Sequence, residues 1–181
     1  RSGARAGDDI YVSGTLGDAR LALEAFRGQL SLPEAVFMRC RERMEQPTPR
    51  VALGMALRGL ASAAADISDG LLGDLGHILR QSGVGARLDL AACEGLLACR
   101  QALTLSESWR RTCVLSGGDD YELVFTAAPV HREALLDAAQ RSQTSVTRIG
   151  VVTASTGLEL RDAQGQCVDS RWTSFDHFAQ D

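Results

Sequence analysis

Hydrophobic residues along the chain recur with two different periods, which predicts strands alternating with helices. Short β-prone or alternating runs predict strands over residues 8–16, 61–65, 86–90, 121–125, 145–152 and 158–160. Apolar residues spaced three and four apart predict helices over residues 17–30, 33–45, 51–60, 71–79, 94–105 and 129–141. This alternation predicts a layered α/β (α+β) domain, which we expect to be a mixed sheet with flanking helices.

The same spacing predicts which face of each helix is buried. The side chains expected to face the core are Ala22, Ala25, Phe26 and Leu30 in the first helix, Val51, Met55 and Leu60 in the third, and Leu135, Leu136 and Ala139 in the last.

A candidate site lies where the strand of small residues 61–65 meets the helix that begins near residue 71. Asp66 and Asp69 are three residues apart there, and Ser68 or Asp69 is a predicted N-cap of the helix. A helix N-terminus attracts anions. Two carboxylates at the same place would repel a bound anion unless a divalent cation lay between them. Because Asp oxygens are ligands that Mg²⁺ prefers, we predict a Mg²⁺–phosphate site. The alternative is that Asp69 only caps the helix while Asp66 is solvated.

A second acidic segment follows the glycine pair at positions 117–118. Asp119, Asp120 and Glu122 place three acids within four positions, directly before an apolar strand. Glycines permit sharp turns or close approach of a ligand to the backbone. This segment is suited to binding a cation or a ligand hydroxyl, and it is equally typical of an ordinary polar turn.

Composition and charge exclude several classes of function. The net charge of −4 and the pI near 5.4 argue against a general role in binding nucleic acid or a membrane surface. All 19 basic residues are arginine, which excludes a P-loop lysine, a protein-kinase strand lysine and a Schiff base within this chain. The five cysteines form no C-x-x-C pair, which favours a cytoplasmic location.

Two further stretches leave alternatives open. Arg50 ends a proline-containing link and is read as a surface charge, with a phosphate contact as the alternative. The tail of the chain concentrates three aromatic residues, Trp172, Phe175 and Phe178. Such a tail normally anchors itself on the core, and the alternative is a stacking surface for a ring-bearing ligand.

Taken together, these motifs resemble the thiamine-monophosphate kinase family of the aminoimidazole-ribonucleotide-synthetase superfamily. The resemblance covers nearly the whole chain, as the C-terminal domain of that enzyme. It rests on residues 8–18 (DDIYVSGTLGD), 47–50 (PTPR), 66–70 (DISDG), 116–123 (SGGDDYEL) and 175–178 (FDHF). Each motif alone is weak, but five in this order and spacing form a specific pattern.

The resemblance implies a kinase that phosphorylates thiamine monophosphate to thiamine diphosphate, with ATP as co-substrate and Mg²⁺ as cofactor. It implies that Asp66 and Asp69 are metal ligands and that Ser68 contacts ATP. It also implies that Asp119 and Phe175 contact the substrate, and it identifies no acid or base catalyst. The family usually has Glu at position 119, so the shorter Asp leaves room for a water-bridged contact.

We expect residues 1–7 to be a linker from a missing N-terminal half and residues 8–181 to be the C-terminal domain. That half carries further metal-binding aspartates in the family, so we expect this chain alone to be inactive. The resemblance also implies a homodimer. One alternative is another ATP-dependent enzyme of the superfamily, such as aminoimidazole-ribonucleotide synthetase or selenophosphate synthetase. The other is a stand-alone binding domain without catalysis.

Overall fold

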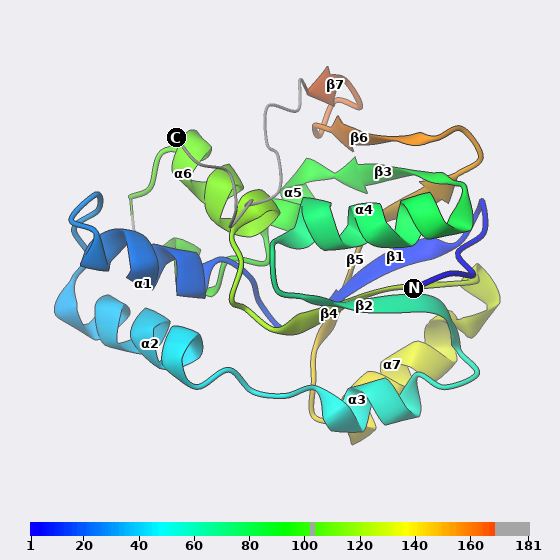
Figure 1. Cartoon of the computed structure of the whole chain (residues 1–181), viewed down its shortest axis with the longest axis horizontal. Coiled ribbons are helices and arrows are strands. Elements are labelled where there is room, and N and C mark those ends of the chain that lie inside the picture. The colour runs from blue at the N-terminus through cyan, green and yellow to red at the C-terminus, as the bar shows by residue number, and fades with distance from the viewer. Residues whose placement is uncertain (102–103, 169–181) are drawn as a thin grey trace.

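The computed structural model describes residues 1–101 and 104–168. Its centre is a seven-stranded mixed sheet in the order β2-β4-β1-β5-β3-β6-β7, in which only the β3–β6 pair is parallel (Figure 1). The strands are β1 (Asp9–Ser13), β2 (Ala61–Ile67), β3 (Gly85–Asp89), β4 (Glu122–Ala127), β5 (Val146–Thr153), β6 (Gly157–Arg161) and β7 (Cys167–Val168). The predicted mixed sheet with flanking helices is confirmed.

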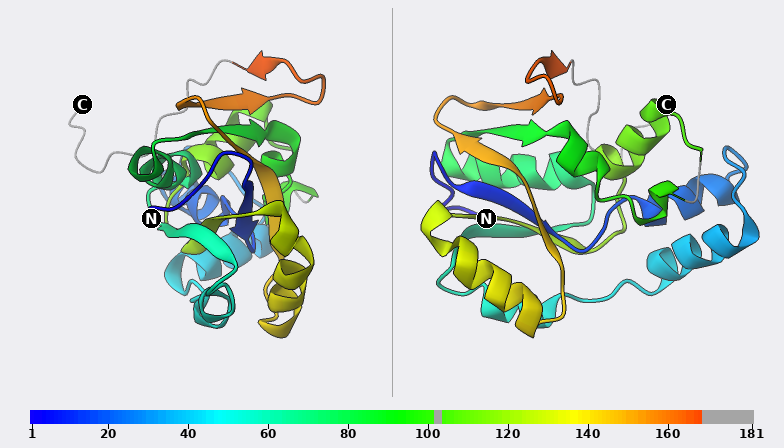
Figure 2. Two further views of the ribbon diagram at one scale, coloured as in Figure 1. Left: turned by 90° about the vertical axis from the view of Figure 1, so that its right-hand side faces the viewer. Right: turned by 180° about the vertical axis from the view of Figure 1, so that it is seen from behind.

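Helices cover both faces of the sheet (Figure 2). They are α1 (Asp18–Phe26), α2 (Glu34–Glu45), α3 (Val51–Ala56), α4 (Leu71–Ser82), α5 (Leu90–Glu94), α6 (Glu107–Arg111) and α7 (Arg132–Arg141), with the short turns η1 (Ala98–Gln101), η2 (Thr112–Ser116) and η3 (Pro129–His131). α4 lies along one face, and α3 and α7 lie together at the other (Figure 1). None of the helices in the described ranges is long and apolar enough to cross a membrane.

The central strands divide their side chains between two apolar cores. Ile10 and Val12 of β1 point into the larger core under α4, and Tyr11 between them points into the smaller core under α3 and α7. Val124 and Phe125 of β4 divide in the same way, and the rings of Tyr11 and Phe125 stack 5.4 Å apart. Each such buried side chain contributes about 1.5–3 kcal/mol through removal of apolar surface from water. Successive side chains of these strands point to opposite faces of the sheet, so helices cover both faces. The result is three layers, with the sheet between two layers of helices.

The predicted helix over residues 94–105 is wrong. α5 begins instead at Leu90, because the carboxylate of Asp89 accepts a hydrogen bond of 3.1 Å from the backbone N–H of Ala92 and caps the helix there. The helix ends before Gly95, and the turn η1 follows at Ala98. Asp89, the last residue of β3, therefore places the start of the helix earlier in the chain than predicted.

Several predicted inward faces are also wrong. Phe26, Val51, Met55 and Leu136 are all more than half exposed. Ala22, Leu135 and Ala139 are buried as predicted, and Leu21 in α1, Leu53 in α3 and Ala138 in α7 are buried beside them. These helices carry apolar residues on more than one side, so the spacing alone does not select the face that meets the sheet.

The first residues of the chain pack against the domain. The hydroxyl of Ser82, the last residue of α4, accepts hydrogen bonds of 3.2 Å from the backbone N–H groups of Gly3 and Ala4. Ala4 is buried in the larger core. The stretch expected to be a linker is thus tied to the end of α4.

Candidate functional site

Two loops that are distant in the sequence interlock at the N-terminal end of α4. The backbone N–H of Asp119 donates to the carbonyl oxygen of Ser68 at 3.0 Å, and that of Tyr121 donates to Ile67 at 3.0 Å. A Cβ atom on Gly118 would lie 2.4 Å from the Ser68 carbonyl oxygen, so only glycine fits there. The structure therefore brings the segment 66–70 and the segment 116–121 together as one candidate site.

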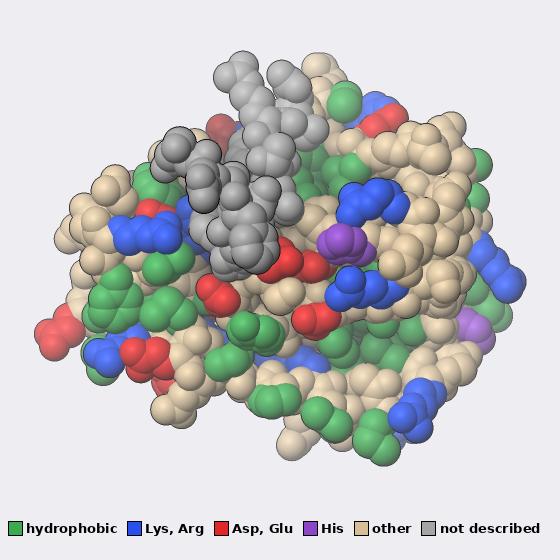
Figure 3. Space-filling model, viewed as in Figure 1, with side chains coloured by type: hydrophobic (Ala, Val, Ile, Leu, Met, Phe, Trp, Pro, Cys, Tyr) green, Lys and Arg blue, Asp and Glu red, His purple; other side chains and the backbone are tan. Residues whose placement is uncertain are grey.

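Four of the five predicted site residues lie in this candidate site: Asp66, Ser68, Asp69 and Asp119. Figure 3 shows acidic side chains gathered on this face of the molecule where α4 begins. The fifth predicted residue, Phe175, lies outside the described residues, as do Trp172 and Phe178. The roles assigned to all five remain predictions.

The start of α4 is organised differently from the sequence prediction. The N-cap is Gly70, with φ of 113°, and neither Ser68 nor Asp69 caps the helix. The carboxylate oxygen Oδ2 of Asp74, in the first turn, accepts hydrogen bonds of 3.0 Å from the backbone N–H groups of Ser68 and Asp69. Asp74 therefore holds the loop that carries the predicted metal ligands, and sequence reasoning missed it.

The electrostatic environment of Asp74 shows that this loop is a region of negative potential. Burial, followed by the charges of Asp69 and Asp66, raises the pKa of Asp74, although the two backbone hydrogen bonds lower it. The Asp66 side chain is 53% exposed and forms a long ion pair of 3.7 Å with Arg1. Accessible carboxylates at a helix N-terminus fit a hard divalent cation such as Mg²⁺. Asp66 and Asp69 could supply two of its ligands.

The backbone of the acidic turn is held in an uncommon conformation. Asp119 and Tyr121 have φ angles of 66° and 53°, in the left-handed region that residues other than glycine rarely occupy. Their hydrogen bonds to the 66–70 loop maintain this geometry. Such backbone strain is typical of functional sites, where surrounding structure enforces it.

Asp120, between these two residues, points inward. Its carboxylate accepts a hydrogen bond of 2.8 Å from the backbone N–H of Gly17, while its Oδ1 atom is buried without a hydrogen-bond partner in the described part of the chain. Burial raises the pKa of Asp120 to about 8, and the charge of Asp18 adds to that shift. Asp120 therefore connects the start of α1 to the candidate site. Because its carboxylate is buried, the contribution of Asp120 to the free energy of unfolding depends on whether it is protonated.

We expect the stability of the protein to depend on pH through Asp120. The folded state keeps this proton to about pH 8, whereas the ordinary pKa of the group is 3.8, so the unfolding free energy falls as pH rises between these values. Each tenfold difference in proton affinity contributes about 1.4 kcal/mol. Asp120→Asn removes this contribution and flattens the curve, as urea unfolding from pH 4.5 to 8.5 would measure.

The exposed Asp137 of α7 provides the matched control, and Asp137→Asn keeps the wild-type slope. Asp18 and Asp74, whose pKa values burial also raises, add slope of the same sign in both variants. An unchanged pH dependence in Asp120→Asn would show that Asp120 is ionised in the folded protein throughout this range.

A buried ion network fixes the other side of the acidic turn. Glu122 is fully buried, and Arg50 binds its carboxylate with two hydrogen bonds of 2.7 and 2.6 Å. Arg43 donates to the same carboxylate at 2.9 Å, and the hydroxyl of Ser13 donates at 2.5 Å. The interpretation of Arg50 as a surface charge is therefore wrong. Arg50 ends the proline-containing link before α3, and its guanidinium pairs with the carboxylate of Glu122. A carboxylate buried in this way needs a charged partner.

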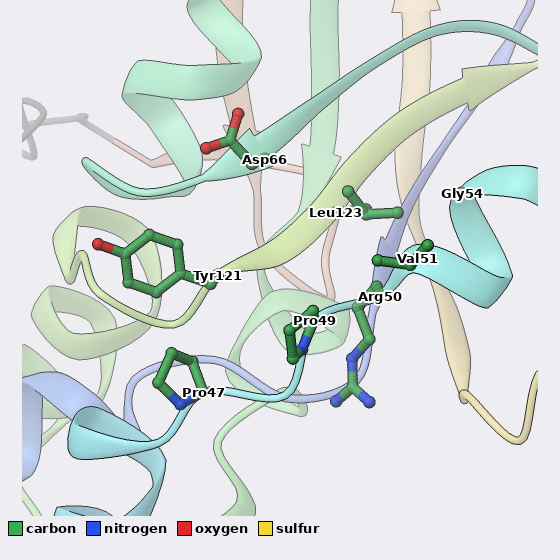
Figure 4. A pocket seen from close by; sticks show the side chains of 8 residues that line it. All are labelled: Pro47, Pro49, Arg50, Val51, Gly54, Asp66, Tyr121 and Leu123. Atoms are coloured by element: carbon green, nitrogen blue, oxygen red, sulfur yellow. The ribbon is translucent and has the colours of Figure 1, made fainter.

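A pocket of about 450 Å³ lies beside these loops. Figure 4 shows Asp66 near the end of β2, Tyr121 just before β4 and Leu123 on β4, opposite the link before α3. The lining residues are Pro47, Pro49, Arg50, Val51, Gly54, Asp66, Tyr121 and Leu123. The pocket is mainly apolar, and Asp66 is its one carboxylate, whereas the guanidinium of Arg50 is already bound to Glu122. Such a lining suits a small, largely apolar ligand.

Comparisons with known proteins agree with this architecture. Residues 5–163 match the family model described as "AIR synthase related protein, C-terminal domain". The chain is 42% identical over 182 residues to thiamine-monophosphate kinase from Salmonella typhimurium, covering 99% of this chain and 55% of the relative. It thus spans about half the length of the curated relatives it matches.

Solved structures give the same result. The crystal structure of thiamine-monophosphate kinase from Stenotrophomonas maltophilia K279a superposes with a TM-score of 0.80 at 42% identity, covering 92% of this chain and 53% of that one. AaThiL complexed with AMPPCP and TMP superposes with a TM-score of 0.71 at 29% identity, covering 98% of this chain and 53% of that one. The chain therefore belongs to the family of AIR synthase related proteins and forms their C-terminal domain.

Proposed function

We propose that this chain is the C-terminal part of a kinase that phosphorylates thiamine monophosphate to thiamine diphosphate, with ATP and Mg²⁺. The observation that carries the proposal is the 42% identity to thiamine-monophosphate kinases over nearly the entire chain. The related AaThiL binds AMPPCP, an analogue of ATP, together with TMP. The interlocked loops of the candidate site supply the chemistry that such a transfer needs.

Phosphoryl transfer between two phosphorylated molecules brings several negative charges together. Catalysis is then mainly positioning and neutralisation of charge. A chain without lysine meets this need with aspartates that hold metal ions, and in this proposal Asp66 and Asp69 are Mg²⁺ ligands. Mg²⁺ bound there would neutralise charge on the phosphate oxygens. The backbone of the same loop is held by Asp74, which keeps both carboxylates positioned.

The remaining predicted residues complete the proposal. Ser68, between the two metal ligands, contacts ATP. Asp119 lies on the facing loop and contacts thiamine monophosphate directly or through a water molecule, since Asp is one methylene shorter than the Glu of the family. The fixed backbone of Asp119 supports this role, because its conformation is set by the loop that carries Ser68.

We expect Phe175 to bind the thiamine moiety. Thiamine has a cationic thiazolium and a flat pyrimidine, and both are suited to an aromatic face. In the full-length enzyme, Phe175→Ala raises KM for thiamine monophosphate about tenfold and leaves KM for ATP within a factor of two, consistent with loss of about 1.4 kcal/mol of contact. Steady-state kinetics with each substrate varied measure both effects.

Phe178→Ala is the matched control, because Phe178 is expected to be a packing residue of the same tail. It changes both KM values little. Equal increases in the two KM values for Phe175→Ala would point to loss of the tail's anchoring and contradict a thiamine contact.

The proposal extends to the rest of the protein. A preceding N-terminal half supplies further metal ligands and the rest of the nucleotide site, residues 1–7 connect it to residues 8–181, and two copies form a homodimer. A cytoplasmic location is supported by the cysteines, all five of which are free thiols.

A substrate screen tests the proposed function. The full-length protein is incubated with ATP, Mg²⁺ and one acceptor at a time: thiamine monophosphate, selenide or formylglycinamidine ribonucleotide. Thiamine diphosphate formed only with the first acceptor is the expected result. Turnover of either other substrate in its place would favour the synthetases of the superfamily, and binding without turnover of any would favour a non-catalytic domain.

A further inference from the structure

Three buried side chains that the proposed function does not use converge at one point. Asp18 is the first residue of α1, Cys40 lies in α2 and Cys99 lies in the turn η1. Each is at most 4% exposed. In residues 1–101 and 104–168, theirs is the one group in which three potential metal-ligand atoms all lie within 4.8 Å of one another.

The spacing of the two sulfur atoms fits a shared metal ion. The Sγ atoms of Cys40 and Cys99 are 3.5 Å apart. Two thiolates bound to one tetrahedral Zn²⁺ ion, each at about 2.3 Å, lie about 3.8 Å apart. A disulfide requires an S–S distance of about 2.05 Å, so the sulfurs would have to move much further to form one.

The Asp18 carboxylate has an unused acceptor. Its Oδ1 atom is buried and has no hydrogen-bond partner among the described residues. Leaving a buried acceptor unsatisfied costs about 1–3 kcal/mol, and more for a charged group. A cation among the three side chains would satisfy this oxygen.

The electrostatics of the group point the same way. Burial, then the charges of Asp18 and Cys99, raises the pKa of Cys40. Burial also raises the pKa of Asp18, although hydrogen bonding from the side chain and backbone of Cys99 lowers it. Arg39 lowers the pKa values of all three residues, and Arg43 lowers that of Asp18. Bound Zn²⁺ would release the thiol protons, and these arginines would offset the excess negative charge of the complex.

We propose that Asp18, Cys40 and Cys99 bind one Zn²⁺ ion, with a water molecule completing the tetrahedron. The site differs in chemistry from the Asp66–Asp69 loop, because thiolates select thiophilic metals whereas carboxylates alone suit Mg²⁺. The ion joins α1 and α2 to the segment that carries Cys99. It also steadies Gly17, the neighbour of Asp18, which donates to Asp120 beside the candidate active site.

Cobalt serves as the spectroscopic probe. The full-length protein, with its thiols kept reduced by a phosphine, is titrated with Co²⁺. One equivalent gives thiolate-to-cobalt charge-transfer absorption, and one equivalent of Zn²⁺ abolishes it. Cys40→Ser, Cys99→Ser and Asp18→Asn each weaken Co²⁺ binding at least tenfold. Cys93→Ser and Cys113→Ser, at buried thiols outside the group, leave it unchanged.

A second measurement uses the wild-type protein, so it tests the proposal even if a variant fails to fold. Zn²⁺ slows alkylation of Cys40 and Cys99 at least tenfold, as read by mass spectrometry, and does not change the rates at Cys93 and Cys113. The proposal is overturned if the reduced wild-type protein shows no thiolate-to-cobalt band, or if Zn²⁺ leaves the alkylation of Cys40 and Cys99 unchanged.

Discussion

We expect Asp66→Asn and Asp69→Asn each to lower kcat of the full-length protein in the proposed kinase reaction at least a hundredfold and to shift its Mg²⁺ dependence to higher concentration. The size follows from the loss of one charged ligand, since removal of a single group that stabilises developing charge costs about 10²–10³ in rate. Asn keeps the size of the side chain and removes its charge. A titration of activity against Mg²⁺, at saturating ATP and thiamine monophosphate, measures both effects.

Asp137→Asn is the matched control, because Asp137 is an exposed carboxylate on α7. It leaves both kcat and the Mg²⁺ titration unchanged. If Asp66→Asn and Asp69→Asn also left the Mg²⁺ titration unchanged, neither residue would be a metal ligand, and Asp66 would be only the solvated carboxylate paired with Arg1.

We expect residues 1–181 alone to fold and to form no thiamine diphosphate. Folding is expected because the described part of the chain contains a sheet with a core on each face. Inactivity is expected because Mg²⁺ demands near-octahedral coordination shared among several ligands, and Asp66 and Asp69 supply too few to neutralise two phosphorylated substrates. The loss relative to the full-length enzyme is at least a thousandfold.

The measurement is an assay of purified residues 1–181 with ATP, Mg²⁺ and thiamine monophosphate, beside the full-length protein. Circular dichroism of the same sample establishes that the chain is folded. Product formed at a rate near that of the full-length enzyme would mean that the site is complete within this chain, and the proposal of a divided active site would fail.

The order and type of most elements could be predicted from the sequence, because they depend on local patterns. The predicted strand over residues 8–16 contains β1, and the predicted helix over residues 33–45 contains α2. The boundary errors have local causes as well. A helix was predicted to start at Glu94, but α5 ends at that residue. The carboxylate of Asp89 caps α5, so the helix begins at Leu90.

Burial could not be predicted in the same way. α3 has apolar residues all round, and the sheet buries Leu53 and leaves Val51 and Met55 exposed. The face of a helix that meets the sheet depends on where the whole helix docks, and that information is not contained in its own residues.

The composition of the acidic motifs at residues 66–70 and 116–121 identified both as candidate binding segments. It did not show that the two segments lie side by side in the folded chain. The hydrogen bond from Asp119 to Ser68 spans about fifty residues of sequence and depends on the antiparallel pairing of β2 with β4. Asp74 and Glu122 were missed as supporting groups for the same reason. Their carboxylates act on backbone groups and arginines that only the folded chain brings near.

The sequence by itself determined which residue types are available: aspartates at two turns, no lysine, and alternating periods that require a layered domain. Those properties follow from composition and short-range sterics, which operate within a few residues. The tertiary structure alone decided which carboxylates stay exposed, as Asp66 does, and which are buried with a partner, as Glu122 is. It also decided that Asp18, Cys40 and Cys99 meet. Burial and charge pairing act through space, so they depend on contacts between segments that are far apart along the chain.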